Sequence, residues 1–126
     1  MVVKTFVSVV DDDESVRESL PDLLGELGFE SRSFASAEEF LASDAMQFTQ
    51  CLILDIAMPG MSGPKLKKEL NRRGFDIPTI FVTGQVDDGI RACLIRQGAI
   101  ECLFKPFSVD DLHAALDAAL PDSGET

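Results

Sequence analysis

Short apolar runs that alternate with helix-spaced segments constrain the fold of this chain most strongly. Residues 6–10, 51–54 and 79–83 are nearly continuous apolar runs, which are typical of strands buried on both faces. Residues 31–34 and 100–104 are predicted as two further strands. Because parallel strands need crossover connections, strands that alternate with helices predict a parallel sheet covered on both faces.

Five helices are predicted after these strands. Apolar residues between Val16 and Leu27 recur with helical spacing. Ser36 and Glu39 predict a capping box that opens a helix through about Asp44. The other helices are expected at 64–73, at 90–97 and after Ser108. The predicted fold class is therefore α/β, a doubly wound five-stranded parallel sheet with five helices.

The composition excludes several classes of function. The chain has 126 residues, which suits one domain, and its 22 acidic against 11 basic residues give a formal charge of −11. Direct binding of nucleic acid or of an anionic membrane is not expected, because both need a basic surface. We find neither an apolar run of ~20 residues nor the cleavage site of a signal peptide, and we expect a cytoplasmic protein.

Three cysteines, Cys51, Cys93 and Cys102, have no spacing that is typical of a zinc site or a disulfide framework. Cysteine without such spacing behaves mainly as a small buried apolar residue. We therefore expect all three to be buried, in a reducing compartment.

Chemically active groups follow the predicted strands. Acids stand at 11–13 and at Asp55, a hydroxyl at Thr83 and an amine at Lys105. Sites of open parallel sheets form at the carboxyl ends of the strands, so these groups are expected to converge. Clustered carboxylates repel one another, and an oxygen-only set of ligands suits Mg²⁺. A carboxylate beside Mg²⁺ can also act as a phosphoryl acceptor.

Four motifs together resemble the receiver domain of bacterial two-component response regulators. They are Val-Asp-Asp-Asp-Glu at 10–14, Leu-Asp-Ile-Ala-Met-Pro-Gly-Met-Ser-Gly at 54–63, Val-Thr-Gly at 82–84 and Phe-Lys-Pro-Phe at 104–107. The chain is most similar to FixJ-type receivers over about residues 4–120. The resemblance implies a flavodoxin-like (CheY-like) fold with a receiver domain at 1–120. Residues 121–126 would then be a linker stub or the natural end of the chain.

The resemblance implies a phosphoacceptor and a set of metal ligands. Asp55 matches the acid that accepts the phosphoryl group. Asp12 matches the acid that binds Mg²⁺ directly, and Asp11 the one that acts through a metal-bound water. Asp55 and the main-chain carbonyl of Ala57 complete the set. Asp13 is instead expected to cap the following helix.

The resemblance also implies switch residues. Thr83 matches the hydroxyl that follows the phosphoryl group, and Lys105 the amine that pairs with the acceptor and then with the phosphoryl oxygens. Pro106 matches a position that carries a cis peptide bond in the family. Cys102 departs from the pattern, because receivers usually have Tyr or Phe there. Phe104 or Phe107 is a candidate to compensate.

Three positions, Gln85, Ala57 and His113, are interpreted from where they stand relative to the acids. Gln85 and Ala57 flank the expected phosphoryl site and are expected to influence hydrolysis. His113 falls in the last predicted helix, away from the acids, and is expected to be a surface residue.

The implied function is a signalling switch rather than an enzyme, although the domain would assist its own phosphorylation and dephosphorylation. A histidine kinase would phosphorylate Asp55, and the surface of the fourth helix, fifth strand and fifth helix would change to control a transcriptional output. Dimerisation on phosphorylation is a family expectation. FixJ-type receivers usually precede a helix-turn-helix output domain, so the resemblance implies that a DNA-binding domain follows residue 126 if residues 121–126 are a linker stub.

Three alternative functions are weaker. A pseudo-receiver that only binds partners stays open because of Cys102. A Mg²⁺-dependent phosphatase would need an acid where Ala57 stands. A flavin module would need a phosphate-binding loop where residues 11–13 are acidic.

Overall fold

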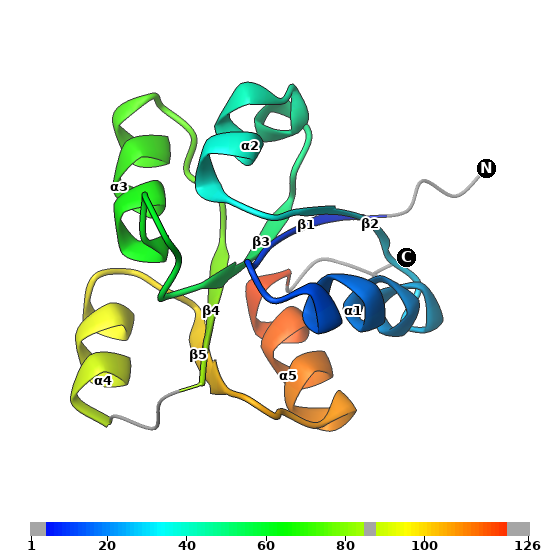
Figure 1. The fold of residues 1–126 in the computed structure, drawn as a ribbon. Coiled ribbons are helices and arrows are strands. Elements are labelled where there is room, and N and C mark those ends of the chain that lie inside the picture. The colour runs from blue at the N-terminus through cyan, green and yellow to red at the C-terminus, as the bar shows by residue number, and fades with distance from the viewer. Residues whose placement is uncertain (1–4, 85–87, 121–126) are drawn as a thin grey trace.

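The strands form one parallel sheet in the order β2-β1-β3-β4-β5 (Figure 1). The computed structural model describes residues 5–84 and 88–120. The strands are β1 (Phe6–Val10), β2 (Glu30–Phe34), β3 (Cys51–Asp55), β4 (Thr79–Thr83) and β5 (Glu101–Phe104). The predicted doubly wound α/β class is confirmed, because every pair of neighbouring strands is parallel.

Helices alternate with these strands along the chain. They are α1 (Glu14–Glu26), α2 (Ala37–Ala42), α3 (Gly63–Arg72), α4 (Asp88–Arg96) and α5 (Val109–Ala119), with a 3₁₀ turn at Ala45–Gln47. The expected helix through Asp44 is too long, since α2 ends at Ala42. The Ser43 hydroxyl accepts a hydrogen bond from the Ala45 amide and starts the turn there.

The cap of α1 agrees with its prediction, whereas the cap of α2 differs in part. The Asp13 side chain accepts from the Ser15 amide and caps α1, as predicted. The predicted capping box of α2 is only half formed: Ser36 accepts from the Glu39 amide, but Glu39 accepts from the amide of Ala35 instead of Ser36.

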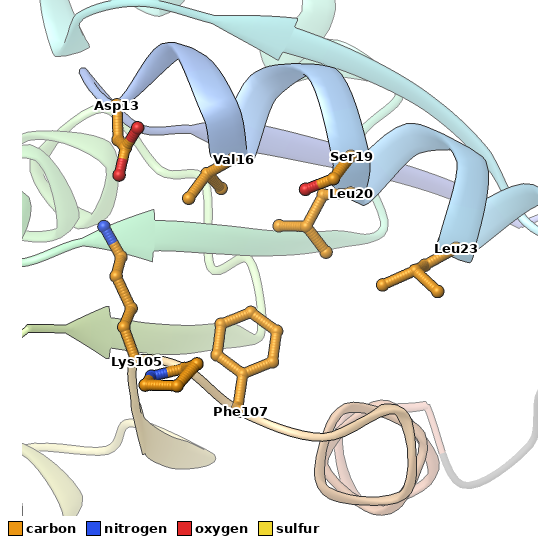
Figure 2. Close-up of a pocket in the computed structure, with 8 residues that line it drawn as sticks. Asp13, Val16, Ser19, Leu20, Leu23, Lys105 and Phe107 are labelled. Carbon is orange, nitrogen blue, oxygen red and sulfur yellow. The ribbon is translucent and has the colours of Figure 1, made fainter.

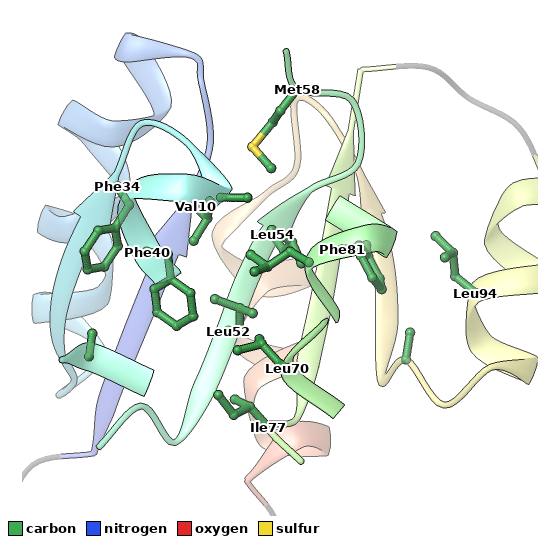
Figure 3. Close-up of a cluster of buried hydrophobic side chains, with 14 of the residues drawn as sticks. Val10, Phe34, Phe40, Leu52, Leu54, Met58, Leu70, Ile77, Phe81 and Leu94 are labelled. Carbon is green, nitrogen blue, oxygen red and sulfur yellow. The ribbon is translucent and has the colours of Figure 1, made fainter. Parts of the chain in front are cut away.

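The sheet separates two apolar clusters. Helices α1 and α5 cover one face with Leu20, Leu24, Leu112 and Leu116. Helices α2, α3 and α4 cover the other, where Phe40, Leu70, Phe81 and Leu94 pack around the central strands (Figure 3). Strand β3 lies between them and is buried over all five residues, which explains its continuous apolar sequence.

The cysteine prediction is partly wrong. Cys51 and Cys102 are buried, but Cys93 is only half-buried. It lies on α4, where the Gln97 side-chain amide contacts its Sγ at 3.3 Å. His113 is on the surface of α5, as predicted, 3.7 Å from Asp117. Within the described ranges, no helix has the length and apolar character needed to cross a membrane.

Candidate functional site

The strand register brings the predicted site residues to one edge of the sheet. Val10 pairs with Leu54, Asp55 with Val82, and Thr83 with Phe104. Asp11 therefore follows β1 at the level where Asp55 ends β3. Lys105 likewise follows β5 at the level where Thr83 ends β4. The convergence expected from the strand ends is present.

Three carboxylates form the centre of this site. Asp11, Asp12 and Asp55 each place a carboxylate oxygen so that all three lie within 4.8 Å of one another. Asp11 and Asp55 are buried, whereas Asp12 is exposed. The site is therefore acidic at its floor and open to solvent at Asp12.

The backbone and α1 hold Asp11 in place. Its Oδ1 accepts a hydrogen bond from the Asp13 amide at 2.9 Å. The guanidinium of Arg17 donates to the main-chain oxygen of Asp11, also at 2.9 Å. Sequence reasoning missed Arg17, because an arginine six residues along, on a predicted helix, gives no signal of this contact.

Lys105 supplies positive charge to two of the acids. Its Nζ lies 2.9 Å from Asp11 Oδ2 and 3.8 Å from Asp55 Oδ1. Burial lowers the pKa of Lys105, but contact with Asp11 and the charges of Asp11 and Asp55 outweigh it, so the pKa is raised overall. Lys105 is therefore a persistent cation at the floor of the site. The bond between Lys105 and Pro106 is cis, as predicted.

The surroundings of Asp55 disfavour the ionised form of its carboxyl group. Its burial, together with the negative charge of Asp11, raises the pKa of Asp55 to about 7. Lys105 acts in the opposite direction but does not offset these effects. Without another cation, Asp55 therefore resists ionisation near neutral pH.

The donor set fits a hard divalent cation. All three side-chain ligands are oxygens, the type that Mg²⁺ prefers. Asp11 Oδ2 is buried and has Lys105 as its ionic partner, but no well-aligned hydrogen bond reaches it within the described part of the chain. Three acids against one lysine leave an excess of two negative charges when all are ionised, which a divalent ion would balance.

The loop after β3 passes over the carbonyl side of Asp55. The Ile56 amide donates to Val82 at 3.0 Å, and the Gly63 amide donates to Ile56 at 3.0 Å. Met58 anchors the loop in the core with 8% exposure. Ala57 lies between these points and is exposed. Gly63 belongs to the motif at 54–63, but nothing in the sequence indicates that it packs against the main chain of Asp55.

The residues expected to act as a switch lie on β4 and β5. Thr83 ends β4 with 6% exposure, and its carbonyl accepts from the Lys105 amide at 2.7 Å. Cys102 pairs in register with Phe81 and is buried in the same apolar cluster. Phe104 and Cys102 line a cavity of about 350 Å³ between β5 and α5. Gln85 lies outside the described residues.

A second cavity, of about 380 Å³, adjoins the acidic site. Its walls are Val16, Leu20 and Leu23 of α1 on one side and Phe107 on the other (Figure 2). The side chains of Asp13 and Lys105 point towards one another at one end of it, as Figure 2 shows. Phe107 therefore packs towards α1 rather than towards Cys102.

Comparisons with known proteins agree with this architecture. The family model described as response regulator receiver domain matches residues 7–117. The chain belongs to this family. The acids, the hydroxyl and the lysine that resemble the motifs of this family all lie at the strand ends that form the site.

Several relatives are transcriptional regulators. The chain is 41% identical to nodulation protein W of Bradyrhizobium diazoefficiens over 92% of its own length and 51% of that protein. It is 40% identical to the transcriptional regulatory protein TdiR of Thauera aromatica over 90% of the chain and 50% of that protein. For the transcriptional regulatory protein FixJ of Azorhizobium caulinodans the identity is 40%, over 94% of the chain and 56% of that protein. The chain spans about half the length of these curated relatives.

Solved structures show the same fold. The response regulator StyR superposes with a TM-score of 0.85 at 41% identity, covering 98% of this chain and 62% of that one. FixJ-N superposes with a TM-score of 0.81 at 33% identity, covering 94% of both chains. The similarity to FixJ-type receivers is thus present in sequence and in fold.

Proposed function

We propose that this domain is a phosphoacceptor switch in which Asp55 receives a phosphoryl group from the phosphohistidine of a partner histidine kinase. The observation that carries the proposal is the juxtaposition of Asp11, Asp12, Asp55 and Lys105 at one sheet edge, within the distances given above. A receiver domain of this family is generally regulatory, and the site contains the groups that such a transfer needs.

The transfer itself is a displacement at phosphorus. A carboxylate oxygen of Asp55 forms the new P–O bond, the P–N bond to the imidazole breaks, and its electron pair stays on the imidazole nitrogen. Lys105 lies 3.8 Å from Asp55 and offsets negative charge on the transferring oxygens. Thr83, buried at the end of β4, is proposed to bind the phosphorylated group through its hydroxyl.

Mg²⁺ is the proposed cofactor. Asp11, Asp12, Asp55 and the main-chain carbonyl of Ala57 would hold it, in agreement with the oxygen-only donor set. When bound, it supplies positive charge that lets Asp55 ionise and that neutralises charge on the phosphoryl oxygens.

The output is proposed to be transcriptional and cytoplasmic. Two relatives that are named as transcriptional regulatory proteins are nearly twice as long as this chain, which supports an output domain beyond the receiver in the whole protein. The surface of α4, β5 and α5 is proposed to change on phosphorylation, because Thr83 and Lys105 connect Asp55 to β4 and β5. Such a change requires that the phosphoryl group stabilise one conformation more than the other. Association into a homodimer is the proposed consequence.

Intact-protein mass spectrometry tests the proposal. With Mg²⁺ and acetyl phosphate, the wild type is expected to gain one phosphoryl group, and the Asp55→Asn variant none. Equal phosphorylation of that variant would refute Asp55 as the acceptor. Release of many phosphates per protein from phosphoesters would indicate a phosphatase instead. No phosphorylation of a folded, Mg²⁺-bound wild type by either acetyl phosphate or a kinase would support the pseudo-receiver alternative.

A further inference from the structure

An acidic side chain from α2 reaches the loop that follows the candidate phosphoacceptor. Glu38 stands in the first turn of α2, and its Oε2 accepts a hydrogen bond from the Met61 amide at 3.0 Å. The two residues are 23 positions apart in the sequence. This contact therefore ties a helix on one side of the sheet edge to the loop between β3 and α3.

Gly60 shows that the same carboxylate is seated closely on the loop. Gly60 has a φ of +77°, in the left-handed region that favours glycine. A Cβ at this position would also lie 2.8 Å from Glu38 Oε2. One carboxylate oxygen thus occupies the space beside Gly60 while it accepts from Met61. Glycine is favoured here by its backbone conformation, and a side chain at this position would displace the Glu38 carboxylate.

Glu38 adds a contact from α2 to a loop that the core and the sheet also hold. The loop is fixed at Ile56, at buried Met58 and at Gly63, and the partly buried Met61 side chain packs against the core. Ala57 and Gly60 are exposed, on either side of the Met58 anchor. A hydrogen bond to the Met61 amide restrains this exposed stretch from outside.

Glu38 is not itself one of the clustered acids. Among the described residues, the cluster within 4.8 Å consists of Asp11, Asp12 and Asp55. The effect of Glu38 on the site must therefore pass through the loop backbone or through long-range charge. A Gln variant distinguishes these two routes, because it keeps an acceptor oxygen and loses the negative charge.

We infer that Glu38 is a positioning residue that holds the loop from Ala57 to Met61 in the conformation that presents the Ala57 carbonyl to Mg²⁺. The inference rests on the proposed function, because it takes Ala57 as part of the metal site. Its physical basis is preorganisation: a loop that is already ordered loses less conformational entropy when the cation binds.

Mg²⁺ affinity tests the inference. Mg²⁺ is titrated into the full chain while amide chemical shifts are followed by NMR, for the wild type, Glu38→Ala, Glu38→Gln and the neighbouring control Glu39→Ala. Glu38→Ala is expected to weaken Mg²⁺ binding about 10-fold, as for other residues that orient a metal ligand from outside. Glu38→Gln and Glu39→Ala are expected to stay within about 2-fold of the wild type, because the amide oxygen still accepts from Met61 and Glu39 does not reach the loop.

The outcomes separate this inference from the proposed function. Wild-type affinity in Glu38→Ala would overturn the positioning role, and equal weakening in Glu38→Gln and Glu38→Ala would assign the effect to charge instead. A folded wild type that binds no Mg²⁺ would refute the proposed metal site itself. The seating of Glu38 on the loop can be tested without any metal.

A double-variant cycle in EDTA provides that second test. Gly60→Ala is made in the wild type and in Glu38→Ala, and thermal midpoints are compared. The strain from the positive φ is the same in both backgrounds, whereas the close approach to Glu38 Oε2 exists in only one. Gly60→Ala is therefore expected to lower the midpoint more in the wild type. Strictly additive effects would overturn the inferred seating of Glu38.

Discussion

Gly63 lies against the main-chain carbonyl of Asp55. A Cβ on Gly63 would fall 2.2 Å from the Asp55 carbonyl oxygen and 3.2 Å from the Cα of Ile56. Both neighbours are backbone, so neither can swing aside as a flexible side chain would. The first residue of α3 is thus packed directly on the residue that ends β3. The loop between them therefore returns to the point where it leaves the strand.

Gly63→Ala is expected to destabilise the protein, since the added methyl group forces α3 away from β3. Overpacking of this kind costs about 1–3 kcal/mol. Urea denaturation in EDTA measures the change. Gly25→Ala is the matched control: Gly25 lies in α1, and a Cβ there meets nothing within 4 Å. That control is expected to be neutral or stabilising by up to about 1 kcal/mol. Unchanged stability of Gly63→Ala would contradict the packing described here.

The raised pKa of Asp55 predicts a pH dependence of stability in the metal-free protein. The folded carboxyl has a pKa of about 7 against an ordinary value of 3.8. Between these values the folded state retains a proton that the unfolded state has lost. The contribution of Asp55 to stability is therefore complete below pH 3.8 and is lost as the pH rises through 7.

Comparison with Asp55→Asn isolates this effect. The free energy of unfolding of the wild type, relative to that of the variant, is expected to fall between pH 5 and pH 7. One proton gives a slope of at most about 1.4 kcal/mol per pH unit. Urea denaturation at half-unit intervals in EDTA measures both curves. Parallel curves would show that Asp55 titrates normally in the folded protein.

Mg²⁺ is expected to stabilise the folded wild type, and more strongly at pH 8 than at pH 6, because binding requires ionised carboxylates. At 100 times the dissociation constant, a ligand specific for the folded state adds about 2.7 kcal/mol. Thermal midpoints with and without Mg²⁺ measure the effect. Asp12→Asn is expected to remove most of it. Asp13→Asn should retain it, because Asp13 caps α1 and Asn serves equally as a cap. Loss of the Mg²⁺ effect in both variants would contradict this assignment.

Lys105→Ala is expected to destabilise the metal-free protein at pH 8. It leaves the carboxylate of Asp11, with 1% side-chain exposure, without its cation. Breaking a buried pair costs about 3–5 kcal/mol, and the 20% exposure of Lys105 points to the lower end of this range. Saturating Mg²⁺ is expected to reduce the loss, which urea denaturation can measure. Lys68→Ala, on the exposed surface of α3, should change stability by less than about 0.5 kcal/mol. Equal losses with and without Mg²⁺ would argue against a shared electrostatic site.

The order of the elements and the place of the acids could be predicted because both depend on local signals. The continuous apolar run of β3 and the position of Asp55 at its end are visible in the sequence. In a parallel sheet, strand ends meet at one edge, so Lys105 could be placed near Asp55 before any coordinates were known.

Contacts between distant segments could not be predicted in the same way. From the sequence, Glu38 is expected to be an exposed acid in the first turn of a helix. A negative charge is favourable at that position without any distant partner. Nothing in hydrophobic periodicity indicates that it accepts from Met61. The end of α2 at Ala42 was also missed, because Ser43 competes for the backbone with its own hydrogen bonds.

The strand order makes the surroundings of Asp55 asymmetric. From β3, the sheet continues through Thr83 on β4 to the residues next to Lys105 on β5, which is one of its two outer strands. On the opposite side, β1 supplies Asp11 and Asp12, and β2 contributes no member of the described acidic cluster. Polar side chains therefore extend from Asp55 as far as the outer strand β5 in one direction, whereas in the other direction they end beside β1, one strand short of the margin formed by β2.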